Sequence, residues 1–174
     1  PATLTPILRD SIETVLKLGW DQVKWPNDLH WHGKKIAGML TEARSDSEML
    51  LDLVFGIGLN INGVTDEFPP EVRAIASSLR EAAGEPFEIN EAAAAIMTRL
   101  LAAAEDYLSG AYREIFDNEW EGCDALVGNR VTIQQTDGEV SGDYAGIDPG
   151  GRVLIRLDDG ETKAFSAGDV TIKK

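Results

Sequence analysis

The chain has little cysteine, little positive charge and no long apolar run. Cys123 is the single cysteine among 174 residues, so neither a disulfide within the chain nor a zinc site built from cysteines can form. The first residues lack a basic segment followed by an apolar core, and no run approaches the roughly 18 to 20 apolar residues of a membrane span. With 43% apolar residues, we expect a globular protein of the cytoplasm with no membrane partner.

Positive charge is scarce, with 16 Lys and Arg against 30 Asp and Glu and a net charge of −14. Binding to nucleic acid requires clustered basic side chains, so we expect no nucleic acid partner for this chain. Lys24, Lys34 and Lys35 stand out against this background as a local cationic group. This group is either a solvated strand end or a site for anions.

The densest combination of charge, aromatic surface and turn-forming residues lies in two stretches, Lys24-Trp25-Pro26-Asn27-Asp28 and Gly33-Lys34-Lys35-Ile36-Ala37-Gly38. Pro26 restrains its own φ and favours an extended Trp25, so a strand through residues 22–24 is predicted to end in a turn here. Residues 36–40 have the pattern of a hairpin's second strand. A carboxylate and two ammonium groups are therefore expected at one end of a hairpin.

The remaining patterns up to residue 124 predict helices around one more strand. We expect helices from Thr5 to Gly19, after a cap at Ser77 or Ser78, after a cap at Asn90, and over about 112–120. The apolar run 49–55 predicts a strand buried on both faces and ending at Gly56. The glycines of the segment 56–62 lack the GxGxxG spacing of a dinucleotide site. His30 and His32 lie two apart on an expected strand, but no third ligand is near, so no metal site is predicted.

The composition changes at about Ala125. Short strand-like runs at 131–133, 138–140, 153–157 and 170–172 alternate with Asp-Gly and Pro-Gly turns. Closely spaced hairpins of this kind predict a small β-barrel. We therefore expect two domains, residues 1–124 and residues 125–174.

Several motifs together resemble the biotin protein ligases, or biotin–[acetyl-CoA-carboxylase] ligases. The motifs are KWPND at 24–28, GKKIAGML at 33–40, GIGLNIN at 56–62, FP at 68–69 and the terminal small barrel. Each motif alone is weak, but their order and spacing cover nearly the whole chain. The resemblance implies an α/β (α+β) catalytic domain with a mixed sheet backed by helices, followed by an SH3-like β-barrel.

The resemblance also implies an activity. Members of the family activate biotin with MgATP to biotinoyl-5′-AMP and pass the biotinoyl group to a lysine of a biotin carboxyl carrier protein or domain. Biotin, ATP and Mg²⁺ are therefore the expected small molecules, the carrier is the expected partner, and a homodimer is left open. A lipoate-type ligase, which shares the fold and an adenylate intermediate, is the alternative enzyme.

Residues of the motifs carry the roles that the resemblance implies. Adenylation gathers negative charge where a carboxylate meets a phosphate, so a fixed cation lowers the barrier. Lys35 matches the family's active-site lysine, and Lys34 replaces it only if the strand register differs by one residue. Asp28 matches the aspartate that helps position the nucleotide and the acceptor amine. Further expected substrate or nucleotide contacts are Asn27, Trp25, Gly38, Gly56, Gly58 and Asn60, although for Trp25 a packing role is favoured over ligand contact.

One family motif, a glycine- and arginine-rich loop of GRGRxGR type, does not occur in the sequence. In the family this loop lies upstream and wraps the biotin carboxyl group and the phosphates. We expect the chain to be the C-terminal part of a longer protein. The alternatives are a second polypeptide that supplies the loop, or a non-catalytic biotin- or adenylate-binding module.

Overall fold

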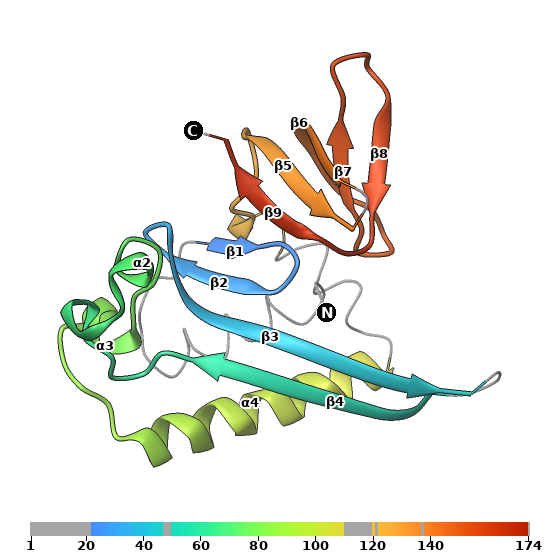
Figure 1. Ribbon diagram of the computed structural model, residues 1–174. Coiled ribbons are helices and arrows are strands. Elements are labelled where there is room, and N and C mark those ends of the chain that lie inside the picture. Colours follow the sequence, from blue (N-terminus) through green and yellow to red (C-terminus); the bar gives the residue numbers. More distant parts are fainter. Residues whose placement is uncertain (1–21, 47–49, 110–119, 121, 137, 174) are drawn as a thin grey trace.

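The computed structural model describes residues 22–46, 50–109, 120, 122–136 and 138–173, which form two antiparallel sheets and a few helices (Figure 1). The first sheet has the strand order β1-β2-β3-β4, from β1 (Gln22–Lys24), β2 (Asp28–Trp31), β3 (Lys34–Ser45) and β4 (Leu50–Leu59). The 3-10 helix η1 (Thr65–Glu67) and the helices α2 (Pro70–Arg73), α3 (Leu79–Ala83) and α4 (Ile89–Ser109) follow it in the chain. The predicted α/β class is confirmed, but the strands described here pair antiparallel, and parallel pairing is limited to two isolated bridges.

The turn at Pro26 forms as predicted, because β1 ends at Lys24 and residues 25–27 reverse the chain. The expected single hairpin is wrong, however, since Asp28–Trp31 forms a strand of its own before β3. His32 and Gly33 connect the two strands with φ of 48° and 76°, and a two-residue turn with positive φ at both positions suits the twist of a hairpin. His30 and His32 therefore do not share one strand face.

Strand β4 differs from its prediction in two ways. It continues through Gly56 and Gly58 to Leu59, because the partner strand β3 supplies backbone hydrogen bonds along this whole length. It is also not buried on both faces, since Val54 is 59% exposed and Phe55 is 37% exposed. The glycine segment is therefore part of the sheet, with one face open.

The helices after the sheet follow local signals. Ser78 caps α3 by accepting from the Glu81 N–H, and Gly84 ends it with a φ of 80°, as the sequence predicts. Helix α4 begins at Ile89, which puts its N-cap at Glu88, so Asn90 lies in the first turn and the predicted cap is wrong by two residues. The predicted helix at 5–19, and the one at 112–120 apart from Trp120, lie outside the described residues.

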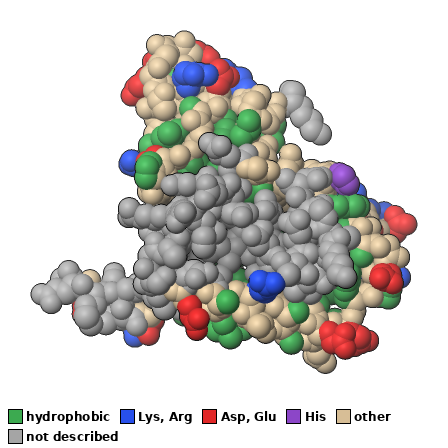
Figure 2. Space-filling view, turned by 180° about the vertical axis from the view of Figure 1, so that it is seen from behind, with side chains coloured by type: hydrophobic (Ala, Val, Ile, Leu, Met, Phe, Trp, Pro, Cys, Tyr) green, Lys and Arg blue, Asp and Glu red, His purple; other side chains and the backbone are tan. Residues whose placement is uncertain are grey.

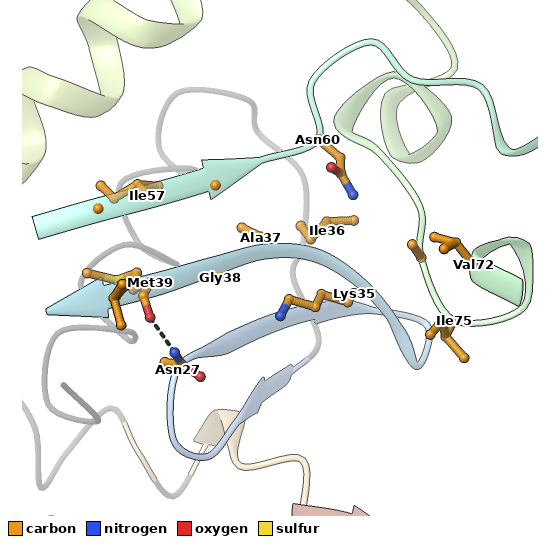
Figure 3. Close-up of a pocket in the computed structure, with 14 residues that line it drawn as sticks. Asn27, Lys35, Ile36, Ala37, Gly38, Met39, Ile57, Asn60, Val72 and Ile75 are labelled. Carbon is orange, nitrogen blue, oxygen red and sulfur yellow. Dashed lines mark hydrogen bonds between the residues drawn. The ribbon is translucent and has the colours of Figure 1, made fainter. Parts of the chain in front are cut away.

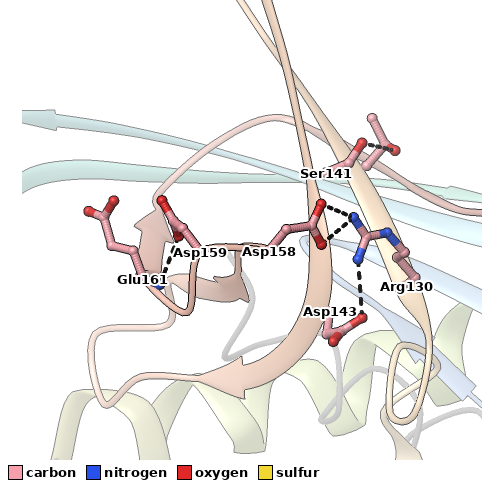
Figure 4. Close-up of polar contacts among 7 residues, drawn as sticks. Arg130, Ser141, Asp143, Asp158, Asp159 and Glu161 are labelled. Carbon is pink, nitrogen blue, oxygen red and sulfur yellow. Dashed lines mark hydrogen bonds and ion pairs between the residues drawn. The ribbon is translucent and has the colours of Figure 1, made fainter.

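The second sheet has the order β8-β7-β6-β5-β9, from β5 (Arg130–Gln135), β6 (Gly138–Ile147), β7 (Val153–Arg156), β8 (Thr162–Phe165) and β9 (Asp169–Ile172). Four of these strands match predicted runs, and β8 was not predicted. The described residues form no closed barrel, since β8 and β9 are the edges of the sheet. Arg130 binds Asp143 of β6 at 3.6 Å and Asp158 at 2.8 Å, so it ties β5 to β6 and to the turn between β7 and β8 (Figure 4).

Buried apolar side chains of both sheets belong to one continuous core. Val23, Trp25 and Ile36 of the first sheet join Ile133 and Ile155 of the second in this cluster. Helix α4 runs along the first sheet and adds Ile96 to this cluster (Figure 1). Acidic side chains occur at the tip of the second sheet and at the opposite end of the molecule, with scattered basic ones among them (Figure 2). None of the helices in the described part of the chain is long and apolar enough to cross a membrane.

The segment between the sheets is fixed by Asp124. Its carboxylate accepts hydrogen bonds from the Tyr144 hydroxyl, from Trp120 Nε1 at 2.9 Å and from the Leu126 N–H at 2.9 Å. Burial raises the pKa of Asp124, and the three donors oppose that rise by stabilising its charged form. A half-buried carboxylate therefore joins the second sheet to the segment that leads into it.

We expect Tyr144→Phe to lower the free energy of unfolding by about 1 to 3 kcal/mol at pH 7, because the half-buried Asp124 carboxylate loses a donor. The loss should shrink as the pH falls through the raised pKa of Asp124, because the protonated carboxyl group needs that donor less. Urea unfolding at pH 7 and pH 4.5 measures both values. Ser141→Ala, which removes a neutral hydrogen bond to Thr132, is the control and should cost the same at both pH values.

Candidate functional site

A cavity of about 720 Å³ lies on the open face of the first sheet (Figure 3). Strands β3 and β4 form its floor, and the segment around Val72, Ile75 and Ala76 forms its far wall. Six of the eight predicted site residues line it, namely Asn27, Lys35, Gly38, Gly56, Gly58 and Asn60. The structure therefore brings Asn27 and Asn60, which lie 33 positions apart in the sequence, to the same cavity.

Three glycines leave the floor of the cavity without side chains. Gly38 pairs with Gly58, and Leu40 pairs with Gly56, so these positions share one face of the sheet. A Cβ atom at Gly56 would lie 3.7 Å from its nearest neighbour, and one at Gly58 would lie 4.0 Å away. The packing of the chain therefore does not require glycine at either position. Their bare backbone leaves room for a molecule that lies flat on the sheet.

Gly38 serves a different purpose, because it lies beneath an ion pair. Lys35 Nζ is 2.6 Å from Asp28 Oδ1, with the Lys35 side chain 48% exposed and that of Asp28 17% exposed. A Cβ atom at Gly38 would lie 3.1 Å from Lys35 Nζ and 3.2 Å from Asp28 Oδ1, closer than ordinary van der Waals contact. Asp28 thus does not line the cavity itself but holds the ammonium group that does.

The backbone of Lys35 is held by the far wall. Its N–H donates to Ile75 O at 2.7 Å, and its carbonyl accepts from the Ser77 N–H at 2.9 Å. These two bonds fix which residue of β3 faces the cavity, so Lys35 and not Lys34 is the cavity lysine. Sequence reasoning missed this wall, because a short parallel bridge between Lys35 and Ala76, 41 positions apart, has no local signal.

The two asparagines are each fixed by the backbone. Asn27 Nδ2 donates to Met39 O, and the Met39 N–H donates to Asn27 O at 2.9 Å, so Asn27 is locked onto β3 (Figure 3). Asn60 Nδ2 donates to Ser77 O at 3.0 Å. Because this bond orients the amide group, the Asn60 carboxamide oxygen is left as an acceptor at the cavity.

Glu81 connects the far wall of the cavity to the segment that follows β4. Its carboxylate accepts from the Thr65 N–H at 2.6 Å, from the Thr65 hydroxyl and from Ser77 Oγ at 2.7 Å. The Thr65 hydroxyl is the main cause that lowers the pKa of Glu81. Glu81 therefore stays ionised and joins the segment after β4 to the residues that hold Lys35.

Trp25 and His30 lie beside the site without lining the cavity. The Trp25 side chain is 1% exposed, and its Nε1 donates to Gly151 O at 2.9 Å, so it lies in the core and does not line this cavity. His30 pairs with Lys35 across β2 and β3. Burial, and then the charge of Lys24, lower the pKa of His30, so its ring is neutral at pH 7.

Two family models match separate parts of the chain. The model described as "Biotin/lipoate A/B protein ligase family" matches residues 11–60, which contain the floor of the cavity. The model described as "Biotin protein ligase C terminal domain" matches residues 126–173, which contain the second sheet.

Full-length relatives agree with these matches. The bifunctional ligase/repressor BirA of Bacillus spizizenii is 32% identical over 149 residues, which are 83% of this chain and 44% of that protein. The biotin–[acetyl-CoA-carboxylase] ligase of Paracoccus denitrificans is 28% identical over 138 residues, which are 77% of this chain and 56% of that protein. The chain thus spans about half the length of the relatives it matches.

Solved structures share the fold. The apo biotin protein ligase of Aquifex aeolicus superposes with a TM-score of 0.83 at 24% identity, covering 100% of this chain and 74% of that one. The same ligase in complex with biotin and ATP gives a TM-score of 0.77 at 23% identity, covering 99% of this chain and 72% of that one. The pair of antiparallel sheets is therefore an arrangement known from solved ligases.

Substitution by alanine is predicted to affect stability differently at the two floor positions Gly38 and Gly58. Gly38→Ala should lower the free energy of unfolding by about 1 to 3 kcal/mol, because the added methyl group presses on the Lys35–Asp28 pair. Gly58→Ala, the matched control on the paired strand, should be neutral or stabilise by a few tenths of a kcal/mol, because its methyl group meets only an ordinary van der Waals contact at 4.0 Å and alanine restricts the unfolded chain. Urea unfolding distinguishes the two, and equal losses would contradict the assignment.

Proposed function

The chain belongs to the biotin protein ligase family, and on that premise we propose that it forms much of the site where a longer protein activates biotin with MgATP. The observation that carries the proposal is the Lys35 ammonium group, held by Asp28 at the edge of a glycine-floored cavity. The product would be biotinoyl-5′-AMP, whose biotinoyl group passes to a lysine of a biotin carboxyl carrier protein or domain.

The cation has a specific task in the first step. A biotin carboxylate oxygen attacks the α-phosphorus of ATP, an O–P bond forms, and pyrophosphate leaves. Both reacting groups are anionic, so Lys35 would reduce their repulsion and stabilise the charge that gathers between them. Asp28 keeps that ammonium group in place, which means that the charge is positioned before the substrates arrive.

The floor and the asparagines would bind the substrates. Gly56 and Gly58 leave an unobstructed surface on which a planar ring can lie close to the backbone. The Asn60 carboxamide oxygen can accept a hydrogen bond from a ring N–H, and Asn27 is fixed at the other end of the floor (Figure 3). The exposed apolar side chains of Ile75 and Leu40 would contact the aliphatic parts of the ligand.

In the second step the acceptor lysine amine attacks the biotinoyl carbonyl carbon, a C–N bond forms, and AMP leaves with the bonding electrons. The amine loses a proton in this step. Asp28 is the nearest described carboxylate to Lys35, so it would stabilise the incoming ammonium group or take up that proton.

The proposal includes several finer features. The ligase region would be residues 1–124, and residues 125–174 would be an SH3-like domain. Mg²⁺ would enter with the ATP phosphates, which supply ligands to this ion in many nucleotide sites. The proposed location is the cytoplasm.

A lipoate-type ligase is the second candidate, because the family model that matches residues 11–60 covers both enzyme classes. The match of residues 126–173 to a biotin ligase domain favours biotin. Titration calorimetry of the full-length protein with biotin and a non-hydrolysable ATP analogue should give heat, and lipoic acid should give none. Binding of lipoic acid alone would reverse the assignment.

We expect Lys35→Ala in the full-length protein to slow biotin-dependent pyrophosphate release on the order of a hundredfold or more, because a preorganised charge is lost. Lys34→Ala is the matched control, since it removes the same charge from the adjacent strand position, outside the cavity lining. Its rate should stay within about twofold of the wild type. Normal turnover by Lys35→Ala would refute the role given to Lys35.

A further inference from the structure

Three consecutive residues at the end of β1 and the start of the turn are each held by a different part of the chain beyond residue 124. Val23 O accepts from the Ala125 N–H at 2.9 Å, Lys24 Nζ lies 3.8 Å from Asp169 Oδ1, and Trp25 Nε1 donates to Gly151 O at 2.9 Å. These partners come from the segment between the sheets, from β9 and from the turn between β6 and β7. The second sheet and the segment that leads into it thus contact residues 23–25 at three points.

The three contacts differ in strength. The Lys24–Asp169 pair is long and Asp169 is 82% exposed, so it contributes little. The Val23–Ala125 bond is an ordinary backbone bond. The Trp25 indole is 1% exposed, so without Gly151 O its N–H would be buried with no acceptor. Trp25 therefore makes the contact whose loss would matter most.

The carbonyl group that Trp25 binds is itself held in position. Asp148 accepts at Oδ1 from the N–H groups of Gly150 at 2.9 Å and Arg152 at 3.0 Å, and its Oδ2 lies 2.6 Å from Arg152 Nη2. Gly151 adopts a φ of 78°, a conformation that glycine reaches without strain. The turn 148–151 is thus a hydrogen-bonded platform that presents one carbonyl oxygen to Trp25.

The site lies on the other side of Trp25. Two residues further along, Asn27 exchanges hydrogen bonds with Met39, and the next residue, Asp28, holds Lys35. Because Pro26 is the single residue between Trp25 and Asn27, a shift of the indole displaces both polar side chains relative to β3.

We propose that Trp25 is a positioning residue, whose indole N–H, fixed on the Gly151 carbonyl, holds Asn27 and Asp28 against β3. The second sheet would then act on the Lys35 site through Trp25 without contact with the substrates. The proposal rests on the proposed function for its catalytic consequence, but its structural part can be tested without turnover.

The first test uses amide hydrogen exchange of the full-length protein. Trp25→Phe keeps the ring and removes only the N–H donor, and Trp120→Phe is the control, since it removes an indole hydrogen bond to Asp124 in the same core. The Met39 amide, which donates to Asn27 O, should exchange at least about tenfold faster in Trp25→Phe than in Trp120→Phe. Equal exchange rates in the two variants, or full protection in Trp25→Phe, would overturn the proposal.

A second pair of variants leaves the core intact, in case Trp25→Phe does not fold. Asp148→Ala removes the carboxylate that shapes the platform, and Asp159→Ala removes the similar bond to the Glu161 N–H in the β7–β8 turn (Figure 4). Only Asp148→Ala should speed exchange at Met39. Faster exchange at Met39 in both variants, or in neither, would contradict a specific route through residue 151.

Kinetics separate positioning from stability. Trp25→Phe should lower kcat for adenylate formation about tenfold with KM for biotin changed less than twofold, because the displaced groups act on the transition state. Trp120→Phe should leave both constants unchanged at a temperature where it is folded. Unchanged kcat in Trp25→Phe would overturn the catalytic part. Absence of adenylate formation by the wild type would refute the proposed function, and the exchange result would still stand.

Discussion

The close fit of Gly38 under the Lys35–Asp28 ion pair is the constraint on which the site depends. The pair crosses from β2 to β3 in the space that a side chain at position 38 would fill. Other hydrogen bonds hold the segments around this pair in place. The far wall fixes the register of Lys35, Asn27 bonds the turn to Met39, and Glu81 bonds to Ser77 in the wall. The ammonium group is therefore oriented by backbone and carboxylate contacts before any ligand is bound.

Local signals made a large part of this arrangement predictable. Pro26 marked the turn, Ser78 and Gly84 marked the ends of α3, and the Asp-Gly and Pro-Gly turns marked the hairpins of the second sheet. Each of these features is fixed by the conformational preference of one or two residues, which a sequence displays directly. The cavity lysine followed from motif order, and the observed register agrees with it.

Features fixed by distant partners were not predictable. The glycine segment after residue 55 has weak strand propensity, and it became a strand because β3 pairs along its length. The wall at residues 72–76 has no periodic pattern, and its bridge joins Ala76 to the distant residue Lys35, so no local sequence pattern signals it. Trp25 fits both packing and ligand contact by its type, and only the position of Gly151, 126 residues away, decided between them.

That separation of 126 residues also affects the order in which the protein can be completed. The strand that carries the polar turn is synthesised long before its partners at Ala125 and Gly151 exist. Contacts between residues so far apart close late, because the chain entropy of a long loop is lost before they form. During synthesis the first sheet therefore carries an unsupported edge, and the geometry around Asn27 and Asp28 is finished only when the last sheet docks.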